Sequence, residues 1–212
     1  MSGVGCRVSG VGCRVSGVGC RVSGVGCRVS GNVRVMTQLG INLIEHMFVL
    51  GIDPGLSTTG YGIVEVAGVS MSAVTAGVIR TSPGDPIAHR LRELADDLEA
   101  VIAEFEPVEA AIEEVFVNRN LQTATSVGRA SGVAILLAAR AGIPIAEYTP
   151  SAVKLAVTGN GSADKRQVQA MVARRLGLDS APKPADAADA LAIAICHAQS
   201  SQLARLVAGD RK

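Results

Sequence analysis

Polar and apolar residues alternate along the part of the chain that follows residue 46, and this pattern predicts β-strands. Phe48–Asp53 is a short apolar run that ends in Pro-Gly. The next two segments, Thr59–Ala67 and Ser70–Arg80, alternate and are rich in β-branched residues. We therefore expect three consecutive strands that form an antiparallel meander.

The rest of the domain is predicted to alternate between helices and short strands. Pro86–Phe105 carries apolar residues at helical spacing and predicts a helix that returns the chain to the sheet. The other predicted elements are strand Val108–Phe116, helix Leu121–Ala141, strand Pro144–Tyr148, and helices at about 151–157, 163–176 and Ala185–Ser200. This order predicts an α/β fold in one domain, in which helices flank a mixed five-stranded sheet.

The composition argues against a membrane protein. Apolar residues make up 48% of the chain but aromatic residues only 2%, so valine, isoleucine, leucine and alanine must fill the core. The most apolar stretch, Gly132–Ala146, is interrupted by Arg140, Gly142 and Pro144, and nothing reaches the roughly 18 to 20 uninterrupted apolar residues that span a bilayer. The N-terminus also lacks the apolar segment of a secretory signal. We expect a cytoplasmic protein.

The net charge gives little support to a nucleic-acid partner. The whole chain carries +1, but from Met47 onward fifteen basic residues face eighteen acidic ones, a net charge of −3. A domain that binds nucleic acid through its overall charge is usually strongly basic. Any such function must therefore depend on local residues and bound cations.

Residues 2–29 repeat the heptapeptide SGVGCRV four times without a difference. Each unit contains two glycines, which argues against a coiled coil. Four of the five cysteines lie in the repeats seven residues apart, unlike the short C-x2-C pairs of zinc sites. We expect residues 1–46 to be a disordered extension, which a start assigned too early would explain, with Met36 and Met47 as candidate starts. Residues 201–212 are expected to form a tail, and Cys196 to be a buried thiol.

Acidic residues at strand ends are the first candidates for chemistry. Asp53 ends the first predicted strand within the pentapeptide GIDPG, whose glycines permit a tight turn and the close approach of a ligand or a phosphate backbone. Glu113 and Glu114 close the predicted strand at 108–116, and period two places them on opposite faces. The residues alone leave open which of the two faces a cleft. A turn aspartate and two solvated glutamates are the ordinary alternatives.

A second group of acids begins the last predicted helix. Asp186 and Asp189 are three residues apart and therefore share one helix face. Helix capping and the helix dipole explain Asp186 without any chemistry. They explain Asp189 less well, because a carboxylate in the second turn of an apolar helix is costly without a partner. His197 lies eleven residues after Asp186, about 16 Å along the helix axis, and is expected to be an ordinary packed or surface histidine.

If these acids converge, bound cations would have to neutralise their mutual repulsion. Carboxylates without an accompanying His or Cys cluster favour magnesium or manganese. Two such ions can activate a water and stabilise the leaving oxygen in an in-line attack on a phosphodiester. The pattern therefore indicates hydrolysis of a nucleic-acid backbone.

Four segments, taken together, resemble the RuvC family of Holliday-junction resolvases. They are GIDPGLSTTGYG at 51–62, AIEEVF at 111–116, GSADKRQVQAMV at 161–172 and ADAADALAIAI at 185–195. The resemblance covers about 47–200 and implies a ribonuclease H-like fold. It also implies a homodimer that makes paired, metal-dependent nicks in two strands of like polarity at a four-way junction, in DNA recombination and repair.

The resemblance also implies a role for individual residues. The catalytic and metal-binding carboxylates would be Asp53, Glu113, Asp186 and Asp189, with two Mg²⁺ ions per active site and Mn²⁺ able to substitute. The residues that contact DNA would be Phe116, which would stack at the opened junction, Lys154 and Lys165, with Arg119, Arg129 and Arg166 as further candidates for phosphate contacts. RuvA and RuvB, the family's branch-migration proteins, are the implied partners.

Two other functions fit parts of the sequence. The segment DPGLSTTG at 53–60 also resembles the phosphate-binding hairpin of the actin, Hsp70 and sugar-kinase superfamily, but no second hairpin of this kind appears. A complete two-domain ATPase would also need a longer chain. A non-catalytic junction-binding protein is the second alternative, and it would require one of the four carboxylates to be missing.

Overall fold

The computed structural model of the protein describes residues 46–115 and 121–209, and the side chains of those up to residue 202. Of the extension predicted at 1–46, residues 1–45 lie outside the described residues, as do Phe116 and Arg119, whereas His46 begins the first strand. The strands are β1 (His46–Asp53), β2 (Thr58–Ala67), β3 (Ser70–Arg80), β4 (Glu109–Glu113) and β5 (Ile145–Tyr148). The helices are α1 (Ile87–Phe105), α2 (Leu121–Arg140), α3 (Pro150–Thr158), α4 (Lys165–Arg175) and α5 (Ala185–Gly209).

The five strands form one mixed sheet in the order β3-β2-β1-β4-β5. β1, β2 and β3 pair antiparallel and form the predicted meander. β4 is parallel to β1, and β5 is parallel to β4, because α1 and α2 return the chain across the sheet between these strands. The α/β class and the mixed five-stranded sheet expected from the sequence are confirmed.

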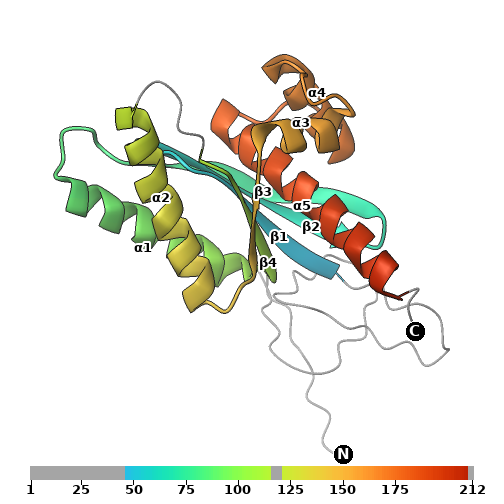
Figure 1. The fold of residues 1–212 in the computed structure, drawn as a ribbon, viewed down its shortest axis with the longest axis horizontal. Coiled ribbons are helices and arrows are strands. Elements are labelled where there is room, and N and C mark those ends of the chain that lie inside the picture. The colour runs from blue at the N-terminus through green and yellow to red at the C-terminus, as the bar shows by residue number, and fades with distance from the viewer. Residues whose placement is uncertain (1–45, 116–120, 210–212) are drawn as a thin grey trace, which may run out of the picture.

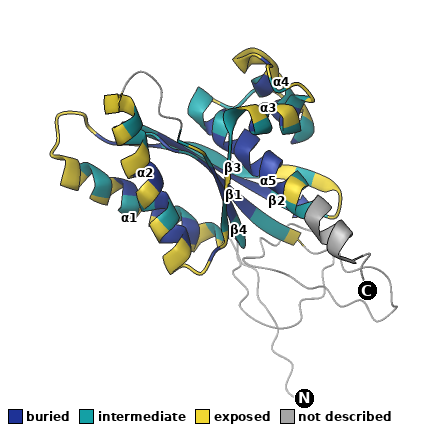
Figure 2. Cartoon of the chain, in the orientation of Figure 1, coloured by how far each residue is buried: buried dark blue, intermediate teal, exposed yellow. Residues whose placement is uncertain are grey.

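Helices cover both faces of the sheet (Figure 1). α1 and α2 lie on one face, and α5 lies on the other with α3 and α4 beside it. Alternation along β1 separates two cores, since Val49 packs toward α5 while Leu50 packs toward α1 and α2. The central strands and the first half of α5 are the most buried part of the molecule (Figure 2).

Three glycines allow α5 to lie directly on β1 and β2. A Cβ at Gly51 would overlap the carbonyl oxygen of Ala190 and lie 2.7 Å from the Ala194 nitrogen. A Cβ at Gly60 would overlap the Asp186 carbonyl, and one at Gly62 would lie 2.8 Å from Leu191 Cδ2. The expectation that Gly51 gives room to a ligand or a phosphate backbone was therefore wrong, because a helix occupies that space. Gly55 does make the predicted tight turn, since a Cβ there would overlap the Thr58 carbonyl oxygen.

The last helix is longer than the sequence predicted. α5 continues to Gly209, so the segment expected to be a tail from residue 201 is helical at least to that point. No glycine or proline interrupts residues 201–208, and nothing in the backbone therefore ends the helix at Ser200. β4 is shorter than the predicted strand: it ends at Glu113, beside the ends of β1 at Asp53 and of β5 at Tyr148. Among the described residues, no helix is both long and apolar enough to cross a membrane.

The contact between α5 and the sheet predicts a large effect of Gly51→Ala. The added methyl group meets backbone atoms of Ala190 and Ala194, which cannot rotate away, so α5 must move off the sheet. We expect the free energy of unfolding to fall by about 3 kcal/mol, measured by urea denaturation. Gly84→Ala is the control, since only Ser82 Oγ lies near that position, and it should change stability by less than about 0.5 kcal/mol. Equal stability of the two variants would contradict the proposed contact.

Candidate active site

Asp53 and Glu113 stand side by side at the ends of two parallel strands. β1 and β4 pair up to Ile52 and Ile112, and each acid is the next residue along its strand. Both have the parity of residues that face α5, as Val49 and Ala111 do. Alternation therefore directs both carboxylates to the α5 side of the sheet. Glu114 has the opposite parity and is exposed, which decides the choice that the sequence left open in favour of Glu113.

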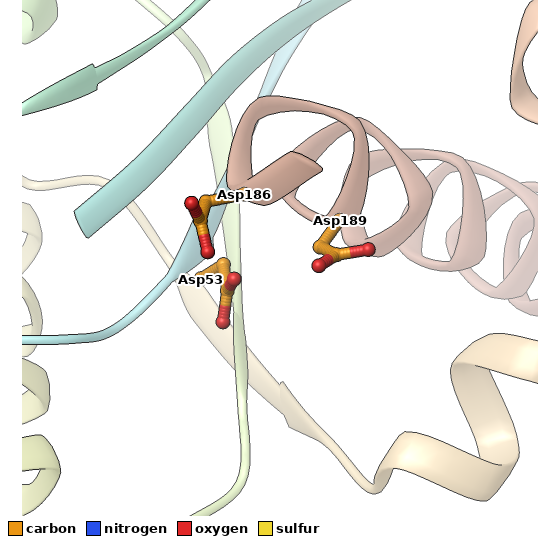
Figure 3. A group of neighbouring side chains, drawn as sticks. All are labelled: Asp53, Asp186 and Asp189. Carbon is orange, nitrogen blue, oxygen red and sulfur yellow. The ribbon is translucent and has the colours of Figure 1, made fainter. Parts of the chain in front are cut away.

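The first two turns of α5 bring two more acids to the same place. Oxygens of Asp53, Asp186 and Asp189 all lie within 4.8 Å of one another. In Figure 3 the carboxylates of Asp53 and Asp186 lie close together, and that of Asp189 comes from the next turn of the helix on the same side. Gly60 is paired with Asp53 across the strands and lies beneath the backbone of Asp186. The close approach of α5 to the sheet thus positions the cluster.

Glu113 lies next to this three-aspartate cluster rather than within it. With Asp189, Lys154 and Lys165 it lines a cavity of about 230 Å³ beside the cluster. Thr149 caps α3, which carries Lys154, and a capping box between Asp164 and Gln167 starts α4 at Lys165. Lys165 Nζ lies 2.7 Å from Asp189 Oδ2. The fold therefore brings together all four predicted carboxylates and both predicted lysines.

The charges of this site are costly to assemble. Burial, followed by the negative charges of Asp189, Glu113 and Asp186, raises the pKa of Asp53 to about 7, with a smaller opposing effect of Lys165. Burial and the charge of Asp189 also raise the pKa of Glu113. The hydrogen bond from Lys165 to Asp189 raises the pKa of the lysine and keeps it charged. At neutral pH the site has an excess of negative charge that a cation would neutralise.

The donor set fits a hard divalent cation. Carboxylate oxygens are the ligands that magnesium and manganese prefer, and no His or Cys belongs to this cluster in the described part of the chain. The desolvated carboxylate of Asp53 faces three other acids, an arrangement that a bound cation would stabilise. Asp53, Asp186 and Asp189 are the residues that would hold such an ion, with Glu113 close by.

The remaining sequence candidates are not among the residues of the cluster or the cavity beside it. Arg129 is exposed on α2 and Arg166 is exposed on α4. His197 is a packed histidine, as predicted: its Nδ1 lies 2.9 Å from Tyr148 Oη and its Nε2 lies 3.0 Å from Glu109 Oε2. Cys196 is the predicted buried thiol, and burial raises its pKa to about 11.

Most of the chain is similar to known proteins in sequence and in structure. A sequence model of the family described as crossover junction endodeoxyribonuclease RuvC matches residues 49–197. The chain belongs to the RuvC family. A relative of that name from Heliobacterium modesticaldum is 53% identical over 154 residues, which cover 73% of this chain and 95% of the relative. One from Leifsonia xyli subsp. xyli is 54% identical over 159 residues, which cover 74% and 76%.

Solved structures of Holliday junction resolvases have the same fold. The structure described as T. thermophilus RuvC in complex with Holliday junction substrate is 39% identical, covers 75% of this chain and 97% of its own, and gives a TM-score of 0.72. The yeast mitochondrial Holliday junction resolvase has a TM-score of 0.54 at 15% identity and supports the fold alone. The ribonuclease H-like class is confirmed, and the chain is an endodeoxyribonuclease rather than an ATPase of the actin superfamily.

The raised pKa of Asp53 predicts that the metal-free protein loses stability as the pH rises. The unfolded carboxyl ionises near pH 3.8 and the folded one near pH 7. Between these pH values the unfolded chain has already lost a proton that the folded state still holds, so raising the pH favours unfolding. The penalty is absent below about pH 4 and complete above about pH 7. We expect Asp53→Asn to be more stable than wild type by about 1 to 3 kcal/mol at pH 8, and equal to it near pH 4.

This comparison is made by urea denaturation in chelator at several pH values. Asp97→Asn, an exposed position on α1, is the control and should follow the wild-type curve. Magnesium at pH 8 should stabilise wild type and Asp97→Asn more than Asp53→Asn. Parallel stability curves for wild type and Asp53→Asn would show that Asp53 carries no such penalty.

Proposed function

We propose that this protein resolves four-way DNA junctions by magnesium-dependent hydrolysis of one phosphodiester bond in each of two strands of like polarity. The convergence of three aspartate carboxylates within 4.8 Å at the end of the sheet carries this proposal. Its DNA substrate and its family make the cytoplasm its expected location.

Asp53, Glu113, Asp186 and Asp189 are the proposed metal ligands. When bound, Mg²⁺ supplies a Lewis acid for the phosphoryl oxygens and lowers the pKa of a coordinated water. Asp53, Asp186 and Asp189 form the cluster. Asp189 also lines the cavity, together with Glu113 and the two lysines. Lys154 and Lys165 line this cavity, and we propose that they contact the phosphates that flank the cleaved bond.

The proposed active form is a homodimer with two such sites. Residues with small side chains are frequent on α2, where Gly128 and Gly132 have no neighbouring atoms within 4 Å of an added Cβ. Leu136 on the same helix is 57% exposed, which makes this surface suitable for a second copy. Phe116 and Arg119 would contact the opened junction, and RuvA and RuvB would deliver it, as in the family.

Cleavage of a labelled synthetic four-way junction, beside a linear duplex of matching sequence, tests the proposal. We expect symmetric paired nicks in the junction alone, which require magnesium and are abolished by chelator. Asp53→Asn should remove cleavage while junction binding in a gel-shift assay persists, and Asp97→Asn should cut like wild type. Equal cutting of junction and duplex would indicate a general nuclease. Tight binding without cutting would favour a junction-binding protein instead.

The two neighbouring glutamates provide a matched pair of variants. Glu113→Gln removes a proposed ligand on the α5 side of the sheet, whereas Glu114→Gln changes an exposed residue of opposite parity. We expect a loss on the order of 100-fold or more in the single-turnover cleavage rate for Glu113→Gln, and a change of less than about threefold for Glu114→Gln. The reverse result would exclude Glu113 as a ligand.

A further inference from the structure

Arg90 occupies an unusual position on α1. The residues of α1 that are buried against the sheet are Leu94, Leu98 and Ile102, which recur every fourth residue. The same row continues one turn toward the N-terminus to Arg90, where an apolar residue would be expected. A cation in the first turns of a helix is also opposed by the helix dipole. The position therefore calls for a specific partner, and the partners are not acidic.

The guanidinium group of Arg90 binds two hydroxyl groups beyond the end of the sheet. Nε donates a hydrogen bond to Thr81 Oγ1 at 2.9 Å, and Nη2 donates one to Ser57 Oγ at 2.8 Å. Thr81 is buried, whereas Ser57 is exposed. Within the described residues, Arg90 forms no ion pair with a carboxylate. The positive charge of Arg90 therefore lies beside the loop that joins β1 to β2, bound to hydroxyl groups and not to a carboxylate.

This β1–β2 loop, residues 54–57, is the direct continuation of Asp53. Its carbonyl groups are held in turn: Thr59 Oγ1 donates to Gly55 at 2.6 Å, and Thr81 Oγ1 donates to Leu56 at 2.5 Å. The Thr81 backbone N–H donates to the Ser57 carbonyl at 3.2 Å. Arg90 binds the hydroxyl group that holds Leu56 and the side chain of the next residue, so it fixes the loop from two directions.

We propose that Arg90 is a positioning residue of the nuclease: through Thr81 and Ser57 it holds the β1–β2 loop, and thereby keeps the Asp53 carboxylate directed at α5. This role rests on the function proposed above. Asp53 faces three other acids, so their repulsion pushes it out of the cluster whenever its backbone is free to shift. On the other side of Asp53, strand β1 is already fixed by pairing with β2 and β4. The β1–β2 loop, on the C-terminal side of Asp53, lies outside this strand pairing and needs other contacts to hold it in place.

The test compares Arg90→Ala and Arg90→Lys with Arg92→Ala, an exposed arginine two residues further along α1. Lysine keeps the charge but cannot bind both hydroxyls in the fork geometry of arginine. Each variant is first checked by thermal denaturation. Three quantities are then measured: binding of Mn²⁺ without DNA by electron paramagnetic resonance, the single-turnover rate of junction cleavage, and the salt dependence of junction affinity.

We expect both Arg90 variants to lose about 10- to 100-fold in cleavage rate or Mn²⁺ affinity, as is typical when a residue that orients a metal ligand is removed. Junction affinity and its salt dependence should stay unchanged, and Arg92→Ala should behave like wild type. Ser57→Ala, which leaves Thr81 and its bonds in place, guards against a folding defect. It should lower the rate by less than Arg90→Ala, and the double variant should be no worse than Arg90→Ala alone.

Other outcomes would overturn the assignment. If Arg90→Ala weakened junction binding and reduced the salt slope by about one while Mn²⁺ affinity was unchanged, Arg90 would be a phosphate contact. If folded Arg90 variants cut and bound metal like wild type, the loop would not position Asp53. A wild-type protein that bound Mn²⁺ but cut no junction would contradict the proposed function, while the Mn²⁺ affinities of the variants would still decide the role of Arg90.

Discussion

Helix α5 contacts the backbone of β1 and β2 with no side chain between them at Gly51 and Gly60. Most helices rest on a sheet through a layer of side chains, which keeps the two backbones apart. Here that layer is missing at the end of the sheet where the acids gather. The backbone of Asp186 consequently lies over Gly60, the partner of Asp53 in the antiparallel pair. Moving α5 away from the sheet would also move Asp186 and Asp189 away from Asp53.

The same helix supplies the free energy that holds the acids together. Leu191, Ile193 and Ile195 of α5 are almost fully buried, and each contributes about 1.5 to 3 kcal/mol by leaving water. The combined contribution of these three side chains exceeds the penalty of a few kcal/mol that the raised pKa of Asp53 represents. The apolar body of α5 can therefore tolerate two acids at its start. Lys165, which binds Asp189, further reduces the repulsion in the absence of a metal.

The sequence predicted the elements better than the contacts between them. Every strand and helix of the described domain was predicted from the sequence, because apolar spacing, composition and the intervening glycines and prolines mark each element even where it is buried on both faces, as β1 is. The four carboxylates were predicted from their motifs. Strand alternation placed Glu113 and Glu114 on opposite faces of the sheet, but it did not show which face carries the site. The direction of those faces depends on which helix covers which side of the sheet, and a strand pattern does not contain that information.

Two features were missed for a related reason. The glycines of the first motif were interpreted as room for a ligand, because a glycine pattern shows that something approaches closely but does not show what it is. Arg90 was overlooked because its partner Ser57, in the β1–β2 loop, lies 33 residues away in sequence. Its position in the row of Leu94 and Leu98 was the available signal, since a charged residue in a buried row usually has a specific partner.

The order in which the chain contributes the cluster has a consequence for the cell. Asp53 belongs to the first strand of the described domain, whereas Asp186 and Asp189 belong to its last helix. Synthesis proceeds from the N-terminus, so a ribosome-bound or truncated chain that ends before α5 has a nearly complete sheet but half of its carboxylates. Such a chain cannot assemble the cation site. The proposed cation site can therefore form only in a late step of synthesis, after α5 has left the ribosome.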